Sequence, residues 1–363
     1  MILNEEQSML RDTLLDLLAE QSPPAALRDW RDRDGIASFN PELWQQLAEL
    51  GLGALVLPEQ HGGLGFGYLG LGAAMEALGR NLSLTPLVGS SVLAGELIAR
   101  AGSEQQCKEW LPAIAAGSVF AVAIDEASHH NPTQLKTELK DGRLNGRKTM
   151  VLNADCAEQY LVVANSDQGR VVAVVAANSA GLECTTEQLM DGSCVSTVCF
   201  DNVQIQALLG ESECAQAISD ALDIAALATA AEQLGGAEAL LEQTVTFMNE
   251  REQFGVKIGS FQALQHRCAQ LFCDLELAKS ALAGALYQLD NGRVELAKMA
   301  SQAKALANDI YLKTSNEATQ LHGGMGVTDE MDIGLYLKRS RVCNQLFGDS
   351  RYHCDRFATL SDF

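Results

Sequence analysis

The sequence predicts a mainly α-helical fold with a small β domain at its centre, and three observations carry this prediction. Helical patterns of apolar residues fill residues 1–115. Short β-branched segments separated by turn residues fill residues 116–210, and long amphipathic patterns return over residues 211–363. We therefore expect an N-terminal helical domain, a small β-barrel as the middle domain and a C-terminal four-helix bundle.

Composition limits the classes of function. The chain has 363 residues, of which 47% are hydrophobic and 20% charged, as expected for a soluble globular protein of two or three domains. Its net charge of −21 argues against a nucleic-acid partner and against an anionic membrane surface. The chain lacks a run of about eighteen apolar residues, so we expect no membrane span.

The cysteines indicate a reducing compartment. The chain has 10 of them, none in a CxxC pair, and Met1–Glu20 carries charges throughout instead of an apolar signal segment. We therefore expect reduced thiols and a cytoplasmic location. No residue cluster predicts a metal site.

The N-terminal third predicts several helices. Asn4-Glu5-Glu6 is a favourable helix start, and Ser22-Pro23-Pro24 predicts the end of the first helix. Further helices are expected over about 41–50, 68–80, 86–101 and 103–115. Glu59–Gly65 predicts a glycine-rich loop between the helices expected over 41–50 and 68–80.

The pattern changes near Val119, where short β-branched runs alternate with Asp-Gly and Asn-Ala-Asp turns. The expected strands are Val119–Ile124, Arg143–Leu152, Tyr160–Ala164, Arg170–Val175 and Val195–Val203. Strands this short and this closely spaced are typical of a small barrel or a sandwich.

The C-terminal part predicts four amphipathic helices. Three follow one another from about 212 to 310, and a fourth covers about 332–346. Alanines and glycines gather between Ala225 and Gly236, where they allow close contact between helices. We interpret the apolar faces of these helices as core packing surfaces.

Two polar turns interrupt the helices. Arg251–Ser260 is glycine-containing and carries two cations in an acidic chain, and Gln320–Gly326 is a second glycine-rich turn. Because the chain is acidic, any bound polyanion must be held by a local cluster of cations and backbone N–H groups, and glycine allows the backbone to approach closely. The alternative is structural: Arg251 caps the preceding helix, and the glycines only end a helix.

The order and spacing of these motifs resemble the acyl-CoA dehydrogenase family over nearly the full chain. The resemblance is carried by Leu47–Gly51 with Pro58–Gly65, by Arg251–Gly255 with Phe261-Gln262, and by Gln320–Gly326. The C-terminal half is similar, more narrowly, to the small subunits of two-component, pimeloyl-CoA-type acyl-CoA dehydrogenases. Phe261–Arg267, Gln320–Glu330 and Leu346–Ser350 carry this narrower likeness.

The resemblance implies an FAD-dependent oxidoreductase that desaturates an acyl-CoA thioester between its α and β carbons. It places the two turns against the flavin nucleotide of a neighbouring subunit. The cofactor-binding residues that it implies are Arg251, Gln253, Phe254, Gln262, Gln320, Gly323, Gly324 and Ser350.

The part of the motif set that faces the flavin ring departs from the family pattern. The family's Thr-Glu-Pro is Asp125-Glu126-Ala127 here, the Gly-Ser-Asp that follows it is missing, and Met150 stands for the family's tryptophan. Met150 suits either a flavin face or a core position. We interpret the adjacent His129-His130 as a solvated loop, because a metal site needs further ligands.

The catalytic base is not assigned from the sequence. The family places a carboxylate at one of two positions, which the resemblance puts at Phe347 and at Ala225 here. Asp349 and Asp223 lie two residues from these positions and are weak candidates, and we interpret both as solvated surface acids.

Three interpretations follow. The chain is a subunit of a heteromeric enzyme whose partner supplies the base, or a self-sufficient homo-oligomer with a displaced base, or a structural partner subunit without catalysis of its own. The resemblance implies a homo- or hetero-tetramer with a second acyl-CoA dehydrogenase subunit, and an electron-transfer flavoprotein or similar acceptor. A role in acyl-CoA degradation is expected, whereas the acyl group itself is not readable.

Overall fold

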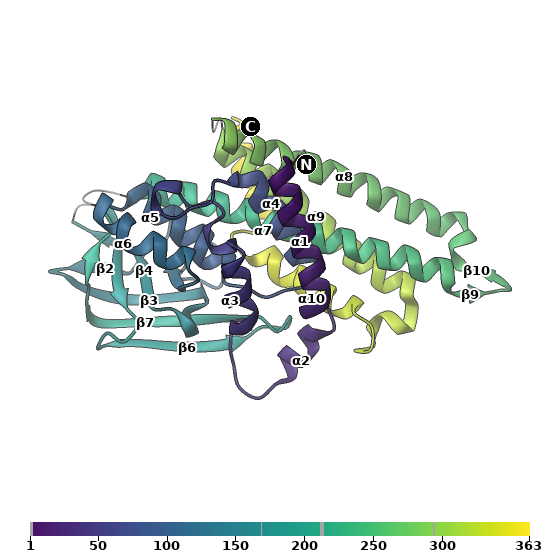
Figure 1. Cartoon of the computed structure of the whole chain (residues 1–363), viewed down its shortest axis with the longest axis horizontal. Coiled ribbons are helices and arrows are strands. Elements are labelled where there is room, and N and C mark those ends of the chain that lie inside the picture. Colours follow the sequence, from purple (N-terminus) through teal and green to yellow (C-terminus); the bar gives the residue numbers. More distant parts are fainter. Residues whose placement is uncertain (1–2, 168, 211–213, 293–294) are drawn as a thin grey trace. The chain divides into compact units, whose positions relative to one another are not determined.

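A computed structural model describes residues 3–167, 169–210, 214–292 and 295–363 (Figure 1). Helices precede and follow a block of strands, as predicted. The chain forms two compact units. The helical unit contains Met1–Asp32, Tyr68–Ser83 and Ala226–Phe363, and the sheet unit contains Arg33–Gly67 and Leu84–Ala225. The three-domain division at residues 115 and 210 stays a prediction.

The sheet unit is built on one eight-stranded sheet with the order β6-β7-β3-β2-β4-β5-β8, and β1 pairs in parallel with β4. Its strands are β1 (Phe120–Ala123), β2 (Glu138–Lys140), β3 (Arg143–Leu152), β4 (Gln159–Ser166), β5 (Gly169–Ala176), β6 (Leu182–Gln188), β7 (Cys194–Gln204) and β8 (Ala207–Leu208). All five predicted strands are present. We did not predict β2, β6 or β8, because two are very short and β6 is polar and exposed along most of its length.

The core of the sheet lies in β4 and β5, where Tyr160–Ala164 and Val171–Val175 are buried on both faces. Such continuous apolar runs are typical of strands covered on both sides. The helices of this unit include α3 (Pro41–Glu49), the π-helix η3 (Leu87–Ala94), α5 (Gly95–Ala101) and α6 (Glu104–Ala115). The π-helix is tied to β1 by the backbone N–H of Phe120, which donates to Ser90 Oγ at 3.0 Å.

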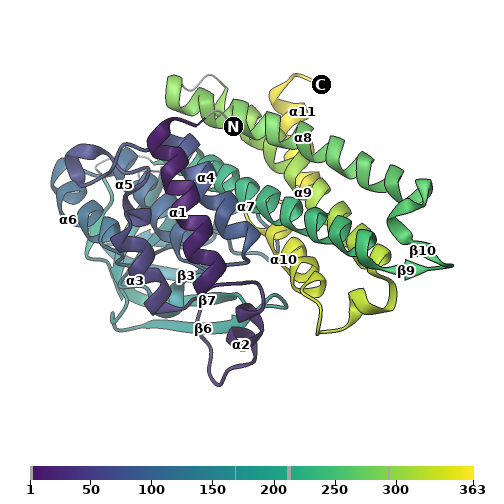
Figure 2. The ribbon, with the colours of Figure 1, turned by 45° about the vertical axis from the view of Figure 1, so that its right-hand side comes forward.

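The helical unit is built around three long helices, α7 (Ala215–Glu250), α8 (Gln262–Asn291) and α9 (Leu296–His322). Figure 2 labels them together with α10 (Ile333–Gln345). These four are the predicted bundle. The unit also contains α1 (Glu5–Gln21), α2 (Ala26–Asp32), α4 (Gly67–Arg80) and α11 (Ser350–Leu360). Helix α1 begins where predicted: Asn4 caps it, and Gln7 completes a capping box at 2.8 and 3.0 Å.

Helices α4 and α7 cross in very close contact. A Cβ added at Gly79 would stand 1.9 Å from the Glu232 carbonyl oxygen, and one at Gly235 would stand 2.1 Å from that of Glu76. Any side chain at these positions would force the helices apart. The glycine at 235 thus has the packing role that its position in a small-residue stretch predicted.

Helices α2 and α11 were not predicted. Helix α2 has only seven residues and follows two prolines, and α11 buries only His353, so neither has an apolar stripe that a periodic pattern could reveal. None of the ten cysteines forms a disulfide, as expected for reduced thiols. In the ranges that the structure describes, no helix is long and apolar enough to cross a membrane.

Candidate functional site

The Arg251 turn is a short hairpin at the end of α7. Strands β9 (Glu252–Gln253) and β10 (Val256–Lys257) pair, with Phe254 and Gly255 at the tip in left-handed conformations, φ 55° and 79°. Phe254 is 92% exposed and packs edge-on against Phe261, with ring centroids 6.3 Å apart. The hairpin projects beyond the end of α7 (Figure 1), and the aromatic ring at its tip is exposed to solvent.

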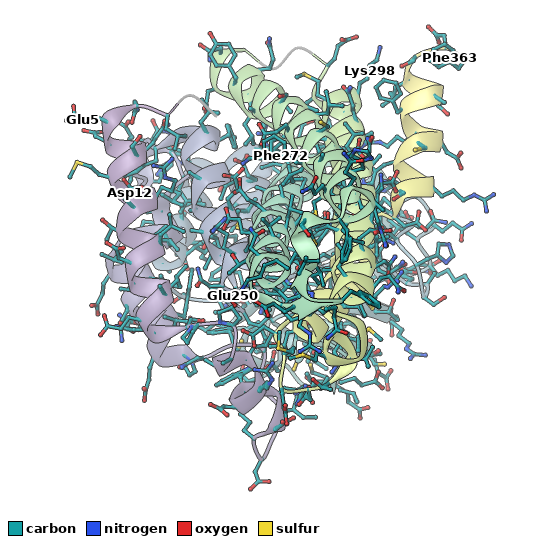
Figure 3. All side chains as sticks on the ribbon, turned by 90° about the vertical axis from the view of Figure 1, so that its right-hand side faces the viewer. Glu5, Asp12, Glu250, Phe272, Lys298 and Phe363 are labelled. Carbon is teal, nitrogen blue, oxygen red and sulfur yellow. The ribbon has the colours of Figure 1, made fainter. Side chains whose placement is uncertain are left out.

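The glycine turn lies at the same end of the helical unit. His322, just before Gly323, stacks on Phe247 of α7 with centroids 4.2 Å apart and planes 22° apart. His322 Nδ1 donates to the Ala318 carbonyl at 2.8 Å, and burial lowers the pKa of the ring, which keeps it neutral. Figure 3 faces this end, where Glu250 marks the last turn of α7. The two turns that the sequence singled out are thus neighbours in space.

The geometry of this end suits a pyrophosphate. Arg251 is exposed, and the cap on the last α7 carbonyl comes from another residue, since Lys257 Nζ donates to the Glu250 carbonyl at 3.0 Å. A Cβ at Gly323 or Gly324 would meet nothing within 4 Å, so the turn is open to a ligand. Both observations favour the cofactor interpretation over the structural one.

The start of α8 adds backbone donors to this surface. Gln262 is its first residue, and no side chain caps the helix N-terminus. Uncapped N-terminal N–H groups bind anions well. Seven of the eight predicted cofactor residues therefore lie at one end of the helical unit: Arg251, Gln253, Phe254, Gln262, Gln320, Gly323 and Gly324.

The structure separates the eighth residue, Ser350, from this surface within the chain. Its Oγ donates to Asp309 at 2.6 Å. Asp309 lies 13 residues before His322 on the same helix, roughly 20 Å along its axis. Ser350 and the glycine turn can meet one cofactor only if different subunits provide them or if the cofactor is extended.

The predicted base positions hold no carboxylate. Phe347 has a left-handed backbone, φ 58°, and its carbonyl accepts from His353 Nε2 at 2.9 Å. Asp349 caps α11 by accepting from the Tyr352 N–H at 2.8 Å. Ala225 is fully buried. Asp349 thus has a structural task in this conformation.

Asp223 corrects one prediction. It is not a solvated surface acid, because only 3% of it is exposed. An isolated acid in a helix of alanines gave no sign of this burial in the sequence. A buried carboxylate two residues from a family base position is a stronger candidate than the sequence indicated.

His130 corrects a second prediction. His129 is exposed as expected, but the His130 side chain is 6% exposed, and its Nδ1 lies 2.8 Å from Asp125 Oδ2. The next acid, Glu126, lies 2.8 Å from Nζ of the buried Lys148. The two acids that replace the family's Thr-Glu therefore hold this loop in place through their contacts with His130 and Lys148.

Backbone strain marks three of the positions that the resemblance singled out. Met150 lies within a register shift between β3 and β7, between Lys148 and Val151, and has φ 55°. Phe254 and Phe347 share this left-handed region, which non-glycine residues rarely adopt. Strain of this kind gathers at ligand and active sites.

A buried polar network supports the loop that contains Phe347. Lys304 is fully buried, and its Nζ donates to Asn308 Oδ1 at 2.6 Å and to the Cys343 carbonyl at 2.9 Å. Asn308 Nδ2 in turn donates to the Gly348 carbonyl at 3.3 Å. The sequence gave no sign of this network, because Lys304 stands among polar and small residues typical of an exposed helix face.

A neighbouring ion pair joins the same core. Arg339 lies 2.6 Å from Glu232 Oε1, with both side chains about nine-tenths buried. Burial lowers the pKa of Lys304 to about 7, against the attraction of nearby acids that include Glu232.

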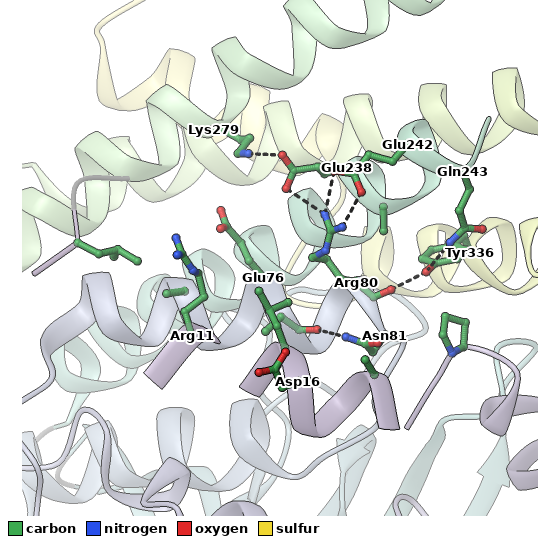
Figure 4. A pocket seen from close by; sticks show the side chains of 17 residues that line it. Arg11, Asp16, Glu76, Arg80, Asn81, Glu238, Glu242, Gln243, Lys279 and Tyr336 are labelled. Atoms are coloured by element: carbon green, nitrogen blue, oxygen red, sulfur yellow. Dashed lines mark hydrogen bonds and ion pairs between the residues drawn. The ribbon is translucent and has the colours of Figure 1, made fainter. Parts of the chain in front are cut away.

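A separate cavity of about 820 Å³ lies among α1, α4, α7, α8 and α10 (Figure 4). Its wall carries a ladder of charges in which Lys279 lies 2.6 Å from Glu238, and Arg80 lies 2.5 Å from Glu242. Burial raises the pKa of Glu76, which also lines it, to about 7. None of the predicted site residues lines this cavity.

Comparisons with known proteins identify the family. The model of the acyl-CoA dehydrogenase N-terminal domain matches residues 4–118, and that of the acyl-CoA dehydrogenase C-terminal domain matches residues 215–359. The acyl-CoA dehydrogenase IpdE2 of Mycobacterium tuberculosis is 31% identical over 96% of this chain and 94% of its own.

Solved structures are similar over the whole fold. The ChsE4–ChsE5 complex from Mycobacterium tuberculosis has a TM-score of 0.91 at 25% identity, covering 100% of this chain and 99% of that one. The Tcur3481–Tcur3483 steroid ACAD has a TM-score of 0.89 at 28% identity, covering 99% and 98%.

The fold and the family matches define a flavin-dependent oxidoreductase that acts on a CH–CH group. The chain belongs to the acyl-CoA dehydrogenase family, and its cofactor is FAD.

The Lys304→Met substitution tests the buried network. Because the folded-state pKa of Lys304 is about 7 and its ordinary value is 10.5, the unfolded chain binds more protons between these values. Stability then rises with pH across this window, by about 1.4 kcal/mol per pH unit. We expect Lys304→Met to remove this slope in chemical unfolding between pH 7 and 9.

Lys313→Met is the matched control, since Lys313 is on the same helix but half exposed beside Asp274. It should leave the slope unchanged. Parallel pH curves for the parent and for Lys304→Met would show that Lys304 stays charged in the fold.

Proposed function

We propose that the chain is the subunit of a heteromeric acyl-CoA dehydrogenase that lacks the usual catalytic glutamate. Its cofactor surface serves an active site that a second, similar subunit completes. One observation carries the proposal: the seven-residue cofactor surface is assembled and open, whereas both family base positions hold apolar residues, Phe347 and Ala225.

The chemistry divides between cofactor, partner and chain. When bound, the isoalloxazine of FAD accepts the β-hydrogen of the acyl thioester as hydride. The partner's carboxylate takes the α-proton. This chain holds the nucleotide: Arg251 clamps the pyrophosphate, and the turn at Gly323-Gly324 and the start of α8 offer backbone N–H groups. Electrons then leave to an electron-transfer flavoprotein or similar acceptor.

The separation of Ser350 from the glycine turn supports an assembly of several chains. A single chain cannot bring both to one end of a nucleotide, but two chains can. Exposed apolar side chains on α8 also suit a subunit contact: Phe272, Leu277 and Tyr287 are each more than half exposed. We propose a tetramer in which this chain alternates with its partner.

The likeness to two-component proteins favours the small-subunit role. The ChsE4–ChsE5 complex and the Tcur3481–Tcur3483 steroid ACAD are each named for two components. From the word steroid in the second name and from the pimeloyl-type likeness of the sequence, we infer a bulky substrate: a CoA ester with a sterol-derived, aromatic or dicarboxylic acyl group. A cytoplasmic location agrees with this use.

The alternative is a self-sufficient homo-oligomer with a displaced base, and the burial of Asp223 favours it. Asp223 lies on α7 near Ala225, and it is a buried carboxylate, the type of group that removes an α-proton. Its position two residues away turns it to a different face of the helix, which argues against the same geometry.

One experiment separates these functions. The chain is purified alone and together with the product of the adjacent reading frame, and flavin bleaching by a panel of acyl-CoA esters is recorded with an artificial electron acceptor. We expect a yellow protein that bleaches only in the two-component preparation. A yellow spectrum of the chain alone would exclude a purely structural subunit.

Bleaching by the chain alone would overturn the partner-subunit proposal. Asp223→Asn then identifies the base: loss of roughly a thousandfold or more in turnover would assign it to Asp223. In the two-component enzyme we expect Asp223→Asn to leave turnover within a few-fold of the parent.

Arg251→Ala tests the nucleotide clamp. Charge-assisted hydrogen bonds are each worth roughly 1.5–3 kcal/mol, so we expect FAD to bind roughly tenfold to hundredfold more weakly. Flavin content after dialysis and titration of the apoprotein with FAD measure the change. Lys108→Ala removes an exposed cation on α6 as a control and should retain flavin. Equal affinity in Arg251→Ala and the parent would reject the clamp.

A further inference from the structure

Two arginines of the short helix α2 bind the segment that follows the glycine turn. Arg31 binds the Asp329 carboxylate with two hydrogen bonds, from Nη1 at 3.0 Å and Nη2 at 2.8 Å. Arg28 donates from Nε to the Asp329 carbonyl at 2.6 Å, and its Nη1 lies 2.8 Å from Asp332 Oδ1. Two arginines thus hold one five-residue connection, Thr328–Asp332, at three points.

The segment Thr328–Asp332 connects the glycine turn to α10. The turn forms the 3-10 helix η6 (Gly323–Val327), and Asp332 directly precedes α10. Inside the turn, the Thr328 N–H and Oγ both bond the Met325 carbonyl, at 3.1 and 2.8 Å. The first end of the turn is fixed by α9, so the arginines supply the restraint at its other end.

The contacts of Arg28 and Arg31 with Asp329 and Asp332, called the α2 clamp below, are more buried than an ordinary surface ion pair. The side chains of Arg28 and Arg31 are 18% and 17% exposed, although Asp329 itself is 60% exposed. The hydrogen bonds that Arg31 donates to Asp32 and Asp329 raise the pKa of Arg31, and Arg31 lowers the pKa of Asp329 to about 2. A planar fork that meets a carboxylate with two bonds fixes direction as well as distance.

We propose that Arg28 and Arg31 are positioning residues for the FAD site, which hold the Gly323–Gly324 backbone in its open form through Asp329 and Asp332. The proposal rests on the function proposed above only for the identity of the ligand. It assigns the N-terminal segment 26–32 a part in cofactor binding, although no residue of α2 is among the predicted cofactor residues.

The pair spacing on α2 agrees with this role. Arg28 and Arg31 stand three residues apart and so share one helix face. Arg31 also bonds the neighbouring Asp32 at 2.6 and 2.7 Å, which holds the guanidinium in place for Asp329. A single exposed arginine would lack this second support.

Two measurements test the proposal separately from the identity of the ligand. Hydrogen exchange with mass spectrometry follows the backbone of residues 323–332, and titration of the apoprotein follows FAD affinity. We expect Arg31→Gln to speed exchange in 323–332 by roughly three- to tenfold and to weaken FAD binding by a similar factor. Exchange in α8 and in the sheet should not change.

Variants distinguish positioning from general stability. Arg31→Asp combined with Asp329→Arg restores an ion pair in reverse and should recover most of the lost protection and affinity. Arg11→Gln, which removes an exposed arginine paired with Asp12 on α1, should change neither readout. Arg251→Ala should lose FAD while exchange in 323–332 stays slow.

Unchanged exchange in 323–332 of Arg31→Gln would overturn the positioning role, whether or not FAD binds. Faster exchange with unchanged FAD affinity would overturn the link from the clamp to the cofactor. A parent protein that does not bind FAD, with the exchange effect intact, would instead reject the proposed function and leave the clamp as a turn-positioning device.

Discussion

The stack of Phe247 on His322 is the contact on which the candidate site depends. It joins the last turns of α7 and α9, two helices whose ends carry the two loops of interest. The ion pair between Arg267 of α8 and Glu317 of α9 closes the same end from the other side. Without these contacts, the Arg251 hairpin and the glycine turn would be unrelated loops more than seventy residues apart in sequence.

The helices on either side of this contact place the residues of the candidate cofactor surface. The hairpin follows directly from α7 and leads directly into the N-terminus of α8, so Arg251 and the uncapped start of α8 are placed together. The glycine turn follows directly from α9. Each ligand-binding group thus stands on the end of a long helix, which holds it more firmly than a free loop would.

In the proposed assembly, this chain binds the cofactor and a partner subunit supplies the catalytic base. The loop at Phe347 is tied through Gly348 to Asn308 and to the buried Lys304, so its backbone is well supported. What stands on that support is an aromatic ring instead of an acid. A chain that keeps the scaffold of a base position and the whole nucleotide surface suits a role beside a catalytic partner.

The fold was largely readable from the sequence, because long periodic helices and β-branched strands carry their own signal. Polar elements such as β6, α2 and α11 were missed, since burial of few apolar residues leaves no period to detect. The motif residues at Arg251 and Gly323 were found by spacing. The burial of Asp223, the Asp125–His130 contact and the Arg31–Asp329 clamp were not, because each depends on partners or neighbours that only the fold brings together.

The most direct test of a cofactor surface that serves a neighbouring subunit is native mass spectrometry of the protein, alone and with its partner. The measurement counts chains and FAD molecules in each species. We expect FAD only in assemblies of two or more chains, because Asp309, the partner of Ser350, lies roughly 20 Å along α9 from the glycine turn, and a neighbouring chain can bring both groups to one nucleotide. A monomer that carries a full equivalent of FAD would contradict this arrangement.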